Sequence, residues 1–259
     1  MKKFKNFKSD EELKKWIYES IAECKTSYPL FDNILLPTAV DIGANVGGFC
    51  VHAHKHFEKI YAFEPSTQNC GVALQVFEQL RLNNVQLFNL AVTAHPGRLV
   101  KLKHPSHSEL FSGNITCLQQ IGEGITLQDT GETCETTSLN QIFEKLEIDR
   151  IDYLKLDCEG GEYDILEGLQ DCDKITFIAM ELHNYYGFER KQSLLGELCN
   201  HFYLFELWDG RIQFDEKLPS RSINDRIGEF RELDNVFAVN KKYYKHLYYM
   251  HLLEKGERI

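Results

Sequence analysis

The sequence lacks the marks of a metal-ribbon, disulfide-stabilised or membrane-spanning protein. Its eight cysteines include no CxxC pair, which argues against a zinc ribbon and against a compact disulfide framework. No apolar run approaches the ~18 residues of a membrane span, and the start, MKKFKNFKSDEELKKW, has no apolar core of signal-peptide length. We therefore expect a cytoplasmic protein with reduced thiols.

Positive charge is scarce in the body of the chain. The formal net charge is -10, but residues 1–27 carry seven Lys against five Asp/Glu and residues 241–259 carry five Lys/Arg against two, so the ends are +2 and +3 and the body is -15. Such an acidic body repels phosphate backbones. Nucleic acid is therefore not the partner we expect.

The chain does contain enough apolar residues for a substantial core, at 43% of 259 residues. Short apolar runs alternate with helical patterns, and such alternation predicts an α/β fold with a mostly parallel sheet, helices on both faces and right-handed crossovers. The seven predicted strands are 38–43, 59–63, 85–92, 151–157, 175–182, 202–207 and 235–239.

Three regions fall outside this alternation. Residues 9–25 have the apolar spacing of an amphipathic helix, residues 97–138 read as a small antiparallel β insertion, and residues 241–259 are rich in tyrosine. We divide the chain into an N-terminal helical extension (1–37), one α/β domain (38–240) and a C-terminal tail (241–259). The tail is expected to pack on the body or on a second subunit, which leaves a homodimer open.

The segment AVDIGANVGGF, residues 39–49, reads as a strand, a tight turn and a helix start. Gly43 and Gly47 let the backbone approach a ligand closely, and Asn45 is among the few other residues that tolerate positive φ. The helix start offers free N–H groups to a nucleotide-like cofactor. Glu64, 21 residues after Gly43, matches the ~20-residue offset of the acid that binds ribose in dinucleotide folds. NAD and S-adenosylmethionine both remain open here.

Later segments narrow this choice. IDYLKLDCEGGEYDILEGL (151–169), ITFIAMELHN (175–184) and CETTSLNQIF (134–143), together with VDIGANVGGF, AFEPSTQN and LAVTAHPG, resemble the FkbM family of S-adenosylmethionine-dependent methyltransferases. The resemblance runs in order from about residue 38 to 240, and its most specific piece is the KxDxEGxE segment. It does not cover the tyrosine-rich tail.

The resemblance implies a seven-stranded class I methyltransferase (Rossmann-like) fold whose last strand is antiparallel, with S-adenosyl-L-methionine as the cofactor. It also implies O-methylation of a small-molecule hydroxyl, on a sugar or a secondary metabolite. Carried over by position, the cofactor-binding residues would be Asp41, Gly43, Asn45 and Gly47 around the methionine and ribose, Glu64 on the ribose hydroxyls, and Asn89 and Ala91 near the adenine.

Catalytic candidates follow two predicted strands whose ends should lie side by side. Asp157 ends one strand, and Glu181 and His183 stand at the end of the next. An imidazole with a pKa near ~6.5 accepts a proton at neutral pH, so His183 is a candidate base. Asp157 is expected to orient the acceptor hydroxyl or to act as the base itself. Glu162 is expected to cap or pair on a helix surface.

Several alternatives stay open at this point. Asp157, His183 and Asn184 would together form a metal site, and their oxygen and imidazole ligands suit Mn²⁺, Fe²⁺ or Zn²⁺ better than Mg²⁺. The other activities consistent with the motifs are N-methylation of a small molecule or peptide, an NAD(P)-dependent oxidoreductase, and a non-catalytic module that only binds S-adenosylmethionine.

Overall fold

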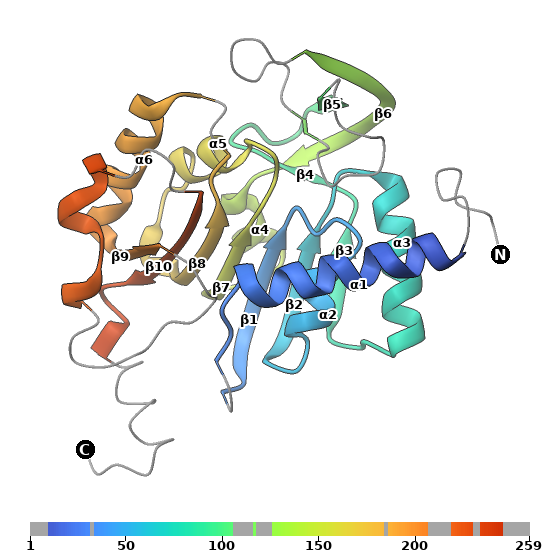
Figure 1. Ribbon diagram of the computed structural model, residues 1–259, viewed down its shortest axis with the longest axis horizontal. Helices are drawn as coiled ribbons and strands as arrows, with labels where there is room; N and C mark the ends of the chain where they lie inside the picture. The colour runs from blue at the N-terminus through green and yellow to red at the C-terminus, as the bar shows by residue number, and fades with distance from the viewer. Residues whose placement is uncertain are drawn as a thin grey trace.

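The centre of the protein is a seven-stranded sheet in the order β3-β2-β1-β7-β8-β10-β9 (Figure 1). The computed structural model describes residues 10–31, 34–105, 116–117, 126–183, 186–206, 219–229 and 234–245. Neighbouring strands from β3 to β8 are parallel, whereas β10 is antiparallel to both β8 and β9. This arrangement confirms the predicted fold class. The strands are β1 (Leu36–Ile42), β2 (Phe57–Phe63), β3 (Val85–Phe88), β7 (Ile151–Leu156), β8 (Ile175–Glu181), β9 (Phe202–Glu206) and β10 (Asn235–Asn240).

Two hydrophobic cores cover the two faces of this sheet. Successive residues of a strand point to opposite faces, so Tyr153 and Phe177 lie in one core while Leu154 and Ile178 lie in the other. The first core packs against α1 (Asp10–Ser27), α2 (Gly48–Ala53) and α3 (Thr67–Leu80); the second packs against α4 (Leu139–Lys145), α5 (Glu162–Glu167) and α6 (Phe188–His201). Short 3₁₀ helices are Cys172–Lys174, Pro219–Arg221 and Asn224–Glu229.

A second, three-stranded sheet has the order β4-β6-β5 and lies beyond the carboxyl ends of the large sheet (Figure 1). It consists of β4 (Ala91–Val92), β5 (Leu99–Pro105) and β6 (Leu127–Thr137). β5 and β6 pair antiparallel, as predicted for the insertion. The predicted strand 85–92 is instead two strands, because β3 stays in the large sheet and β4 pairs with β6. The break falls at Asn89, whose amide donates to the carbonyls of Glu64 and Pro65.

The predicted N-terminal helix is present as α1, and it packs on the body of the protein. Cys24 and the following Tyr28 are buried in the core that also contains Phe49 of α2. At the other end, Tyr244 is buried against Tyr203, with ring centroids 5.6 Å apart, and the Tyr243 hydroxyl donates to the carbonyl of Asp173. Residues 246–259 of the tail lie outside the described residues. All eight cysteines have free thiols. No helix within the described ranges is long and apolar enough to cross a membrane.

Candidate active site at the carboxyl ends of the parallel strands

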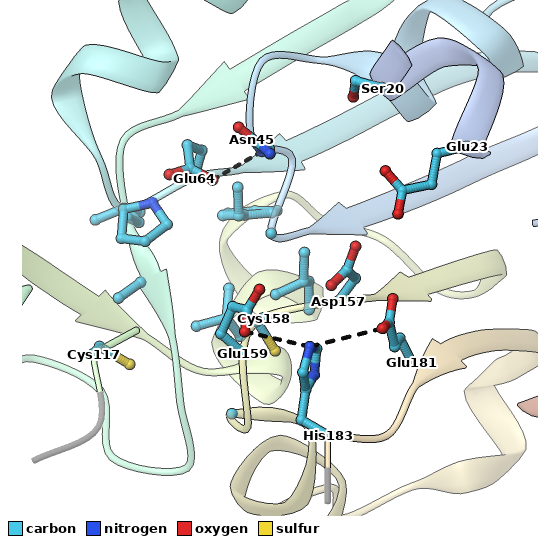
Figure 2. A pocket seen from close by; sticks show the side chains of 18 of the residues that line it. Ser20, Glu23, Asn45, Glu64, Cys117, Asp157, Cys158, Glu159, Glu181 and His183 are labelled. Atoms are coloured by element: carbon cyan, nitrogen blue, oxygen red, sulfur yellow. Dashed lines mark hydrogen bonds and ion pairs between the residues drawn. The ribbon is translucent and has the colours of Figure 1, made fainter. Parts of the chain in front are cut away.

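The parallel strands β1, β2, β7 and β8 all end at one edge of the sheet, and a cavity of about 580 Å³ lies there. Ligands of open α/β sheets bind at this edge, and the cavity has the size of a small-molecule site, roughly 300–1,000 Å³. In Figure 2, Asn45 and Glu64 lie on one side of the cavity, and Glu181 and His183 lie on another. Residues from β1 and β2 thus line a different side of the cavity from those that follow β7 and β8.

The turn after β1 forms part of the cavity wall through Gly43 and Asn45. Gly43 has a φ of 78°, and a Cβ there would overlap the carbonyl oxygen of Asp157, so only glycine lets the turn approach the end of β7. Asn45 also has positive φ, at 50°, and its Oδ1 is buried without a hydrogen-bond partner in the described structure. Gly47 does not line the cavity; its φ is 85° and a Cβ would meet the ring of Phe77.

Asp41 lies beneath the cavity rather than in its wall. Its side chain is fully buried, accepts a hydrogen bond from the Cys50 thiol, and lies 3.3 Å from Lys155 Nζ. Lys155 also donates to the carbonyl oxygen of Gly43 at 2.7 Å and lies 3.5 Å from Asp157 Oδ2. Burial lowers the pKa of Lys155, but Asp41 and Asp157 outweigh it, so the pKa is raised and the amine stays charged. Asp41 thus positions the lysine that joins the turn to β7.

Glu64 lines the cavity at the end of β2 and is held by three N–H donors. Its Oε1 accepts from Ser66 N and Asn69 Nδ2, and its Oε2 accepts from Asn45 N at 2.8 Å. Because each carboxylate oxygen has two lone pairs, Oε2 retains the capacity for one further bond from a ligand hydroxyl. Burial raises the pKa of Glu64 to about 7, although these donors lower it.

One end of the cavity is mainly apolar. Its residues come from the end of β2, the turn before α3, the chain around β4 and the insertion between β5 and β6, and they are Phe63, Pro65, Leu90, Ala91, Val92 and Cys117. Ala91, which was predicted to lie near the adenine, lines this end of the cavity. Asn89 does not line the cavity. Its side-chain amide instead donates hydrogen bonds to the backbone carbonyls of Glu64 and Pro65, just after the end of β2.

The opposite end is acidic. Asp157 is about one-third exposed, at 31%, and its Oδ2 accepts a 2.9 Å hydrogen bond from the Tyr28 hydroxyl. Burial raises the pKa of Asp157, but Lys155, His183 and Tyr28 together bring it below its ordinary value. Glu181 on the neighbouring strand is exposed to a similar degree, at 34%. Burial and repulsion from Asp157 raise the pKa of Glu181 to about 7.

His183 is held between carboxylates, which corrects our expectation of a neutral histidine. Its Nδ1 lies 3.0 Å from Glu162 Oε1 and its Nε2 lies 3.3 Å from Glu159 Oε2. Burial lowers the pKa of His183, but Glu162, Glu159 and Asp157 outweigh it and raise the pKa to about 10. An imidazolium has no lone pair to accept a proton, so this environment does not favour His183 as the base.

Glu162 was expected on a helix surface, and that expectation is wrong. It is fully buried at the start of α5 and also accepts from the backbone N–H of Cys158 at 2.8 Å. The turn before α5 brings the Glu162 carboxylate next to the His183 ring, and the spacing of these residues in the sequence does not indicate this contact. Asn184, the third residue of the predicted metal site, lies outside the described residues.

Helix α1 supplies a wall of the cavity that was not predicted. Glu19, Ser20 and Glu23 all line it, and Figure 2 shows Glu23 across the cavity from His183. Burial and repulsion from Asp157 raise the pKa of Glu23. In the sequence these residues have only the polar pattern of a solvated helix face, so no signal distinguished them.

A family model and one curated relative match the sequence of this chain. The model of the methyltransferase FkbM domain matches residues 41–213. The AMB antimetabolite synthetase AmbE of Pseudomonas aeruginosa is 25% identical over an alignment of 193 residues, and the match covers 59% of this chain and 9% of that protein. The chain thus spans less than a tenth of the length of this relative.

Solved structures resemble the chain more distantly. A methyltransferase FkbM from Methylobacillus flagellatus KT has a TM-score of 0.47 and 10% identity, and the match covers 91% of this chain and 56% of that one. A putative methyltransferase from Streptococcus mutans, in complex with S-adenosylhomocysteine, has a TM-score of 0.40 and 14% identity, and the match covers 90% and 99% of the two chains.

Proposed function

Because this chain belongs to the FkbM methyltransferase family, we propose that it transfers a methyl group from S-adenosylmethionine to a hydroxyl of a small molecule, such as a sugar or a secondary metabolite. The observation that carries this proposal is the cavity at the carboxyl ends of the strands, which is apolar at one end and acidic at the other. An adenosine and a reacting centre need environments that differ in this way.

The unused hydrogen-bonding capacity of the wall fits the cofactor. Asn45 Oδ1 is buried without a hydrogen-bond partner in the described structure, and such an atom costs free energy until a ligand donor reaches it. Glu64 Oε2 has room for one ribose hydroxyl. The apolar residues around Leu90 and Ala91 offer a surface for the adenine ring. We therefore place the adenosine between Glu64 and β4, and the methionine part towards Asp157.

The protein's share of the reaction is alignment and proton removal. S-adenosylmethionine supplies an activated methyl group: its S–CH₃ bond breaks with the electron pair going to sulfur, while the acceptor oxygen forms the new O–CH₃ bond. Fixing two reactants in line contributes on the order of 7 kcal/mol or more, and a positioned base contributes about 10²–10⁴-fold. The residues at the acidic end supply both.

We assign the proton to a carboxylate at this end, and specifically to Glu181. The two nitrogens of His183 already face Glu162 and Glu159, and Asp157 Oδ2 accepts from Tyr28 and pairs with Lys155. Glu181 is one-third exposed and lies 3.9 Å from His183 Nε2, too far for a hydrogen bond. Asp157 then orients the acceptor, and His183 holds Glu159 in place.

Calorimetric titration of the purified, cofactor-stripped protein with S-adenosylmethionine, S-adenosylhomocysteine and NAD tests this proposal. We expect micromolar binding of the first two and none of NAD. Asn45→Ala should weaken the binding about 3–10-fold, as for one neutral hydrogen bond, whereas Glu78→Gln on the exposed side of α3 should leave it unchanged. Binding of NAD alone would instead support an oxidoreductase.

Turnover separates the remaining alternatives. Formation of S-adenosylhomocysteine with hydroxyl acceptors supports the proposal, and formation only with amines would make the chain an N-methyltransferase. Cofactor binding without S-adenosylhomocysteine from either acceptor panel would identify a binding module.

A further inference from the structure

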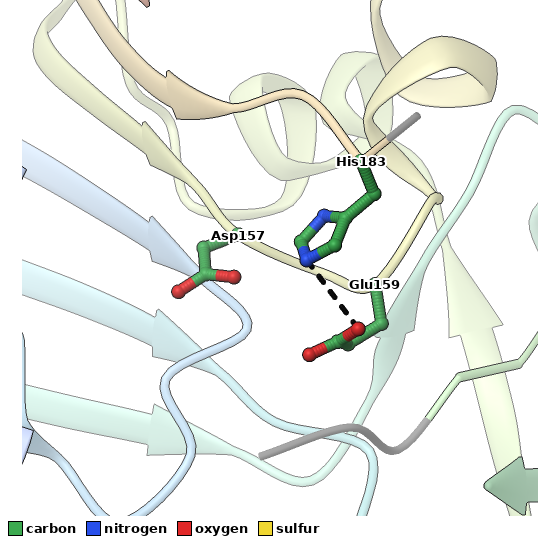
Figure 3. A group of neighbouring side chains, drawn as sticks. All are labelled: Asp157, Glu159 and His183. Atoms are coloured by element: carbon green, nitrogen blue, oxygen red, sulfur yellow. Dashed lines mark ion pairs between the residues drawn. The ribbon is translucent and has the colours of Figure 1, made fainter. Parts of the chain in front are cut away.

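Three side chains at the acidic end have the spacing of metal ligands. One ligand atom each from Asp157, Glu159 and His183 lies within 4.8 Å of the others (Figure 3). With metal bonds of ~2.1 Å, two ligands of one ion are at most roughly 4.2 Å apart. His183 Nε2 and Glu159 Oε2, at 3.3 Å, are already within that limit. The 4.8 Å spread of the whole group exceeds that limit by roughly 0.6 Å, so an ion would have to draw the side chains closer together.

Glu162 provides a second, independent observation. Histidines that bind metals usually donate their other ring N–H to a carboxylate, which fixes the ring and directs the remaining nitrogen to the ion. Here Glu162 Oε1 takes the Nδ1 side of His183 at 3.0 Å, so Nε2 is the nitrogen that faces Asp157 and Glu159. Glu162 is fully buried, and its Oε2 has no hydrogen-bond partner in the described part of the chain.

The charge of this end also favours a cation. The carboxylates of Asp157, Glu159, Glu162 and Glu181 surround a single imidazole, while Lys155 is shared between Asp41 and Asp157. Tyr28 and Lys155 both approach Oδ2 of Asp157, which makes Oδ1 the oxygen available to an ion. Four carboxylates against one imidazole and one lysine leave an excess of negative charge, and Glu162 among them is fully buried, so a further positive charge at this end is favourable.

We propose that Asp157, Glu159 and His183 bind a divalent first-row metal ion, with Glu162 as the carboxylate that orients His183. The ion would replace the proton on His183 Nε2, because an imidazole binds a metal through a deprotonated ring nitrogen. Two carboxylate oxygens and one imidazole suit Mn²⁺, Fe²⁺ or Zn²⁺ better than Mg²⁺. The set keeps Asp157 and His183 from the sequence expectation and adds Glu159, whereas Asn184 lies outside the described residues. The role of the ion rests on the function proposed above: it would bind the acceptor oxygen and favour its deprotonation.

Mn²⁺ titration followed by electron paramagnetic resonance tests the site without any acceptor. The signal of free Mn²⁺ should fall until one ion is bound per chain, and Zn²⁺ should displace it more readily than Mg²⁺. Glu159→Gln keeps the side-chain size and should weaken Mn²⁺ binding at least tenfold. Glu23→Gln removes an acid from the opposite wall of the same cavity and should change it less than threefold. Thermal unfolding followed by circular dichroism serves as the control and should show that both variants are folded.

Two results would overturn the proposal: no Mn²⁺ site in the wild-type protein up to millimolar ion, or equal weakening by Glu159→Gln and Glu23→Gln, which would mean diffuse attraction rather than coordination. A parallel titration with S-adenosylmethionine keeps this question apart from the function. Cofactor binding without Mn²⁺ binding would contradict the metal site and leave the proposed methyltransferase function standing. Mn²⁺ binding without cofactor binding would support the metal site and contradict the proposed function.

Discussion

Glu64 combines a fixed position with an adjustable charge. Three N–H donors hold its two oxygens, yet burial raises its pKa to about 7, well above the ordinary value of 4.5. Because the folded state takes up this proton more readily than the unfolded state, the stabilisation is complete below pH 4.5 and is lost as the pH rises through 7. The ionised form, in contrast, is the better acceptor for a ribose hydroxyl.

Cofactor affinity should therefore increase with pH even as the unliganded protein becomes less stable. Between pH 6 and pH 8 the ionised fraction of a group with a pKa near 7 rises from about a tenth to about nine tenths, so S-adenosylmethionine should bind up to roughly ninefold more tightly at pH 8. Calorimetry at the two pH values measures this change. Glu64→Gln should remove it, and a variant that retains the full pH dependence would show that another group is responsible.

Lys155 is the residue whose loss should cost the most stability. It is 3% exposed and serves Asp41, Asp157 and the carbonyl of Gly43 at once. Lys155→Met leaves Asp41 buried without its cation, and breaking a buried ion pair in this way lowers the free energy of unfolding by about 3–5 kcal/mol. Urea denaturation measures the loss.

A double variant and a surface variant make this prediction specific. Adding Asp41→Asn to Lys155→Met removes the uncompensated charge and should recover a large part of the loss. Lys15→Met breaks an exposed ion pair with Glu19 on α1 and should cost less than about 1 kcal/mol. If the two single lysine variants were equally stable, the buried network would contribute nothing beyond a surface pair.

At the scale of elements, the docking of α1 on α2 determines the shape of the cavity. The two helices meet where Gly48 opens α2, and a Cβ on Gly48 would overlap the side chain of Ser20. The same turn of α1 carries Glu19, Ser20 and Glu23 to the cavity wall. A displacement of α1 therefore moves this wall as well.

Gly48→Ala should loosen α1 and lower stability by about 1–3 kcal/mol, the usual cost of overpacking. Adding Ser20→Ala removes the overlapping hydroxyl and should recover part of the loss, but not all of it, because the backbone carbon and Cβ of residue 20 stay 3.1 Å from the added Cβ. Thermal unfolding measures both effects, and limited proteolysis shows whether cleavage within residues 10–31 increases in the single variant. No loss in Gly48→Ala would mean that the helices already have room to separate.

At the scale of the whole molecule, the parts that follow from chain topology could be predicted from sequence. The apolar runs located the strands of the large sheet, and parallel strands bring their carboxyl ends to one edge. Gly43, Asn45, Glu64, Asp157, Glu181 and His183 therefore meet at one cavity as expected. Each of these residues lies at or just after the end of a strand, so the path of the backbone alone places it at this edge of the sheet.

The parts that depend on tertiary packing could not be predicted. Within the predicted strand 85–92, a single polar residue such as Asn89 did not indicate that β4 leaves the large sheet for the small one. The protonation of His183 depends on Glu162 and Glu159, which reach it only through the turn before α5. To predict the wall formed by α1, one would have to know which face of this amphipathic helix meets the cavity. The polar residues of that face have the same sequence pattern as residues of a solvated face.

The bond between Tyr28 and Asp157 has a consequence for how the molecule folds. It joins residues 129 positions apart, so α1 leaves the ribosome long before the strand that carries its partner. A nascent chain can complete this contact only after Asp157 has been synthesised, and structures that depend on such distant contacts form slowly. The wall of the cavity should accordingly be among the last parts to become ordered during refolding, and the binding of ligands should begin only then.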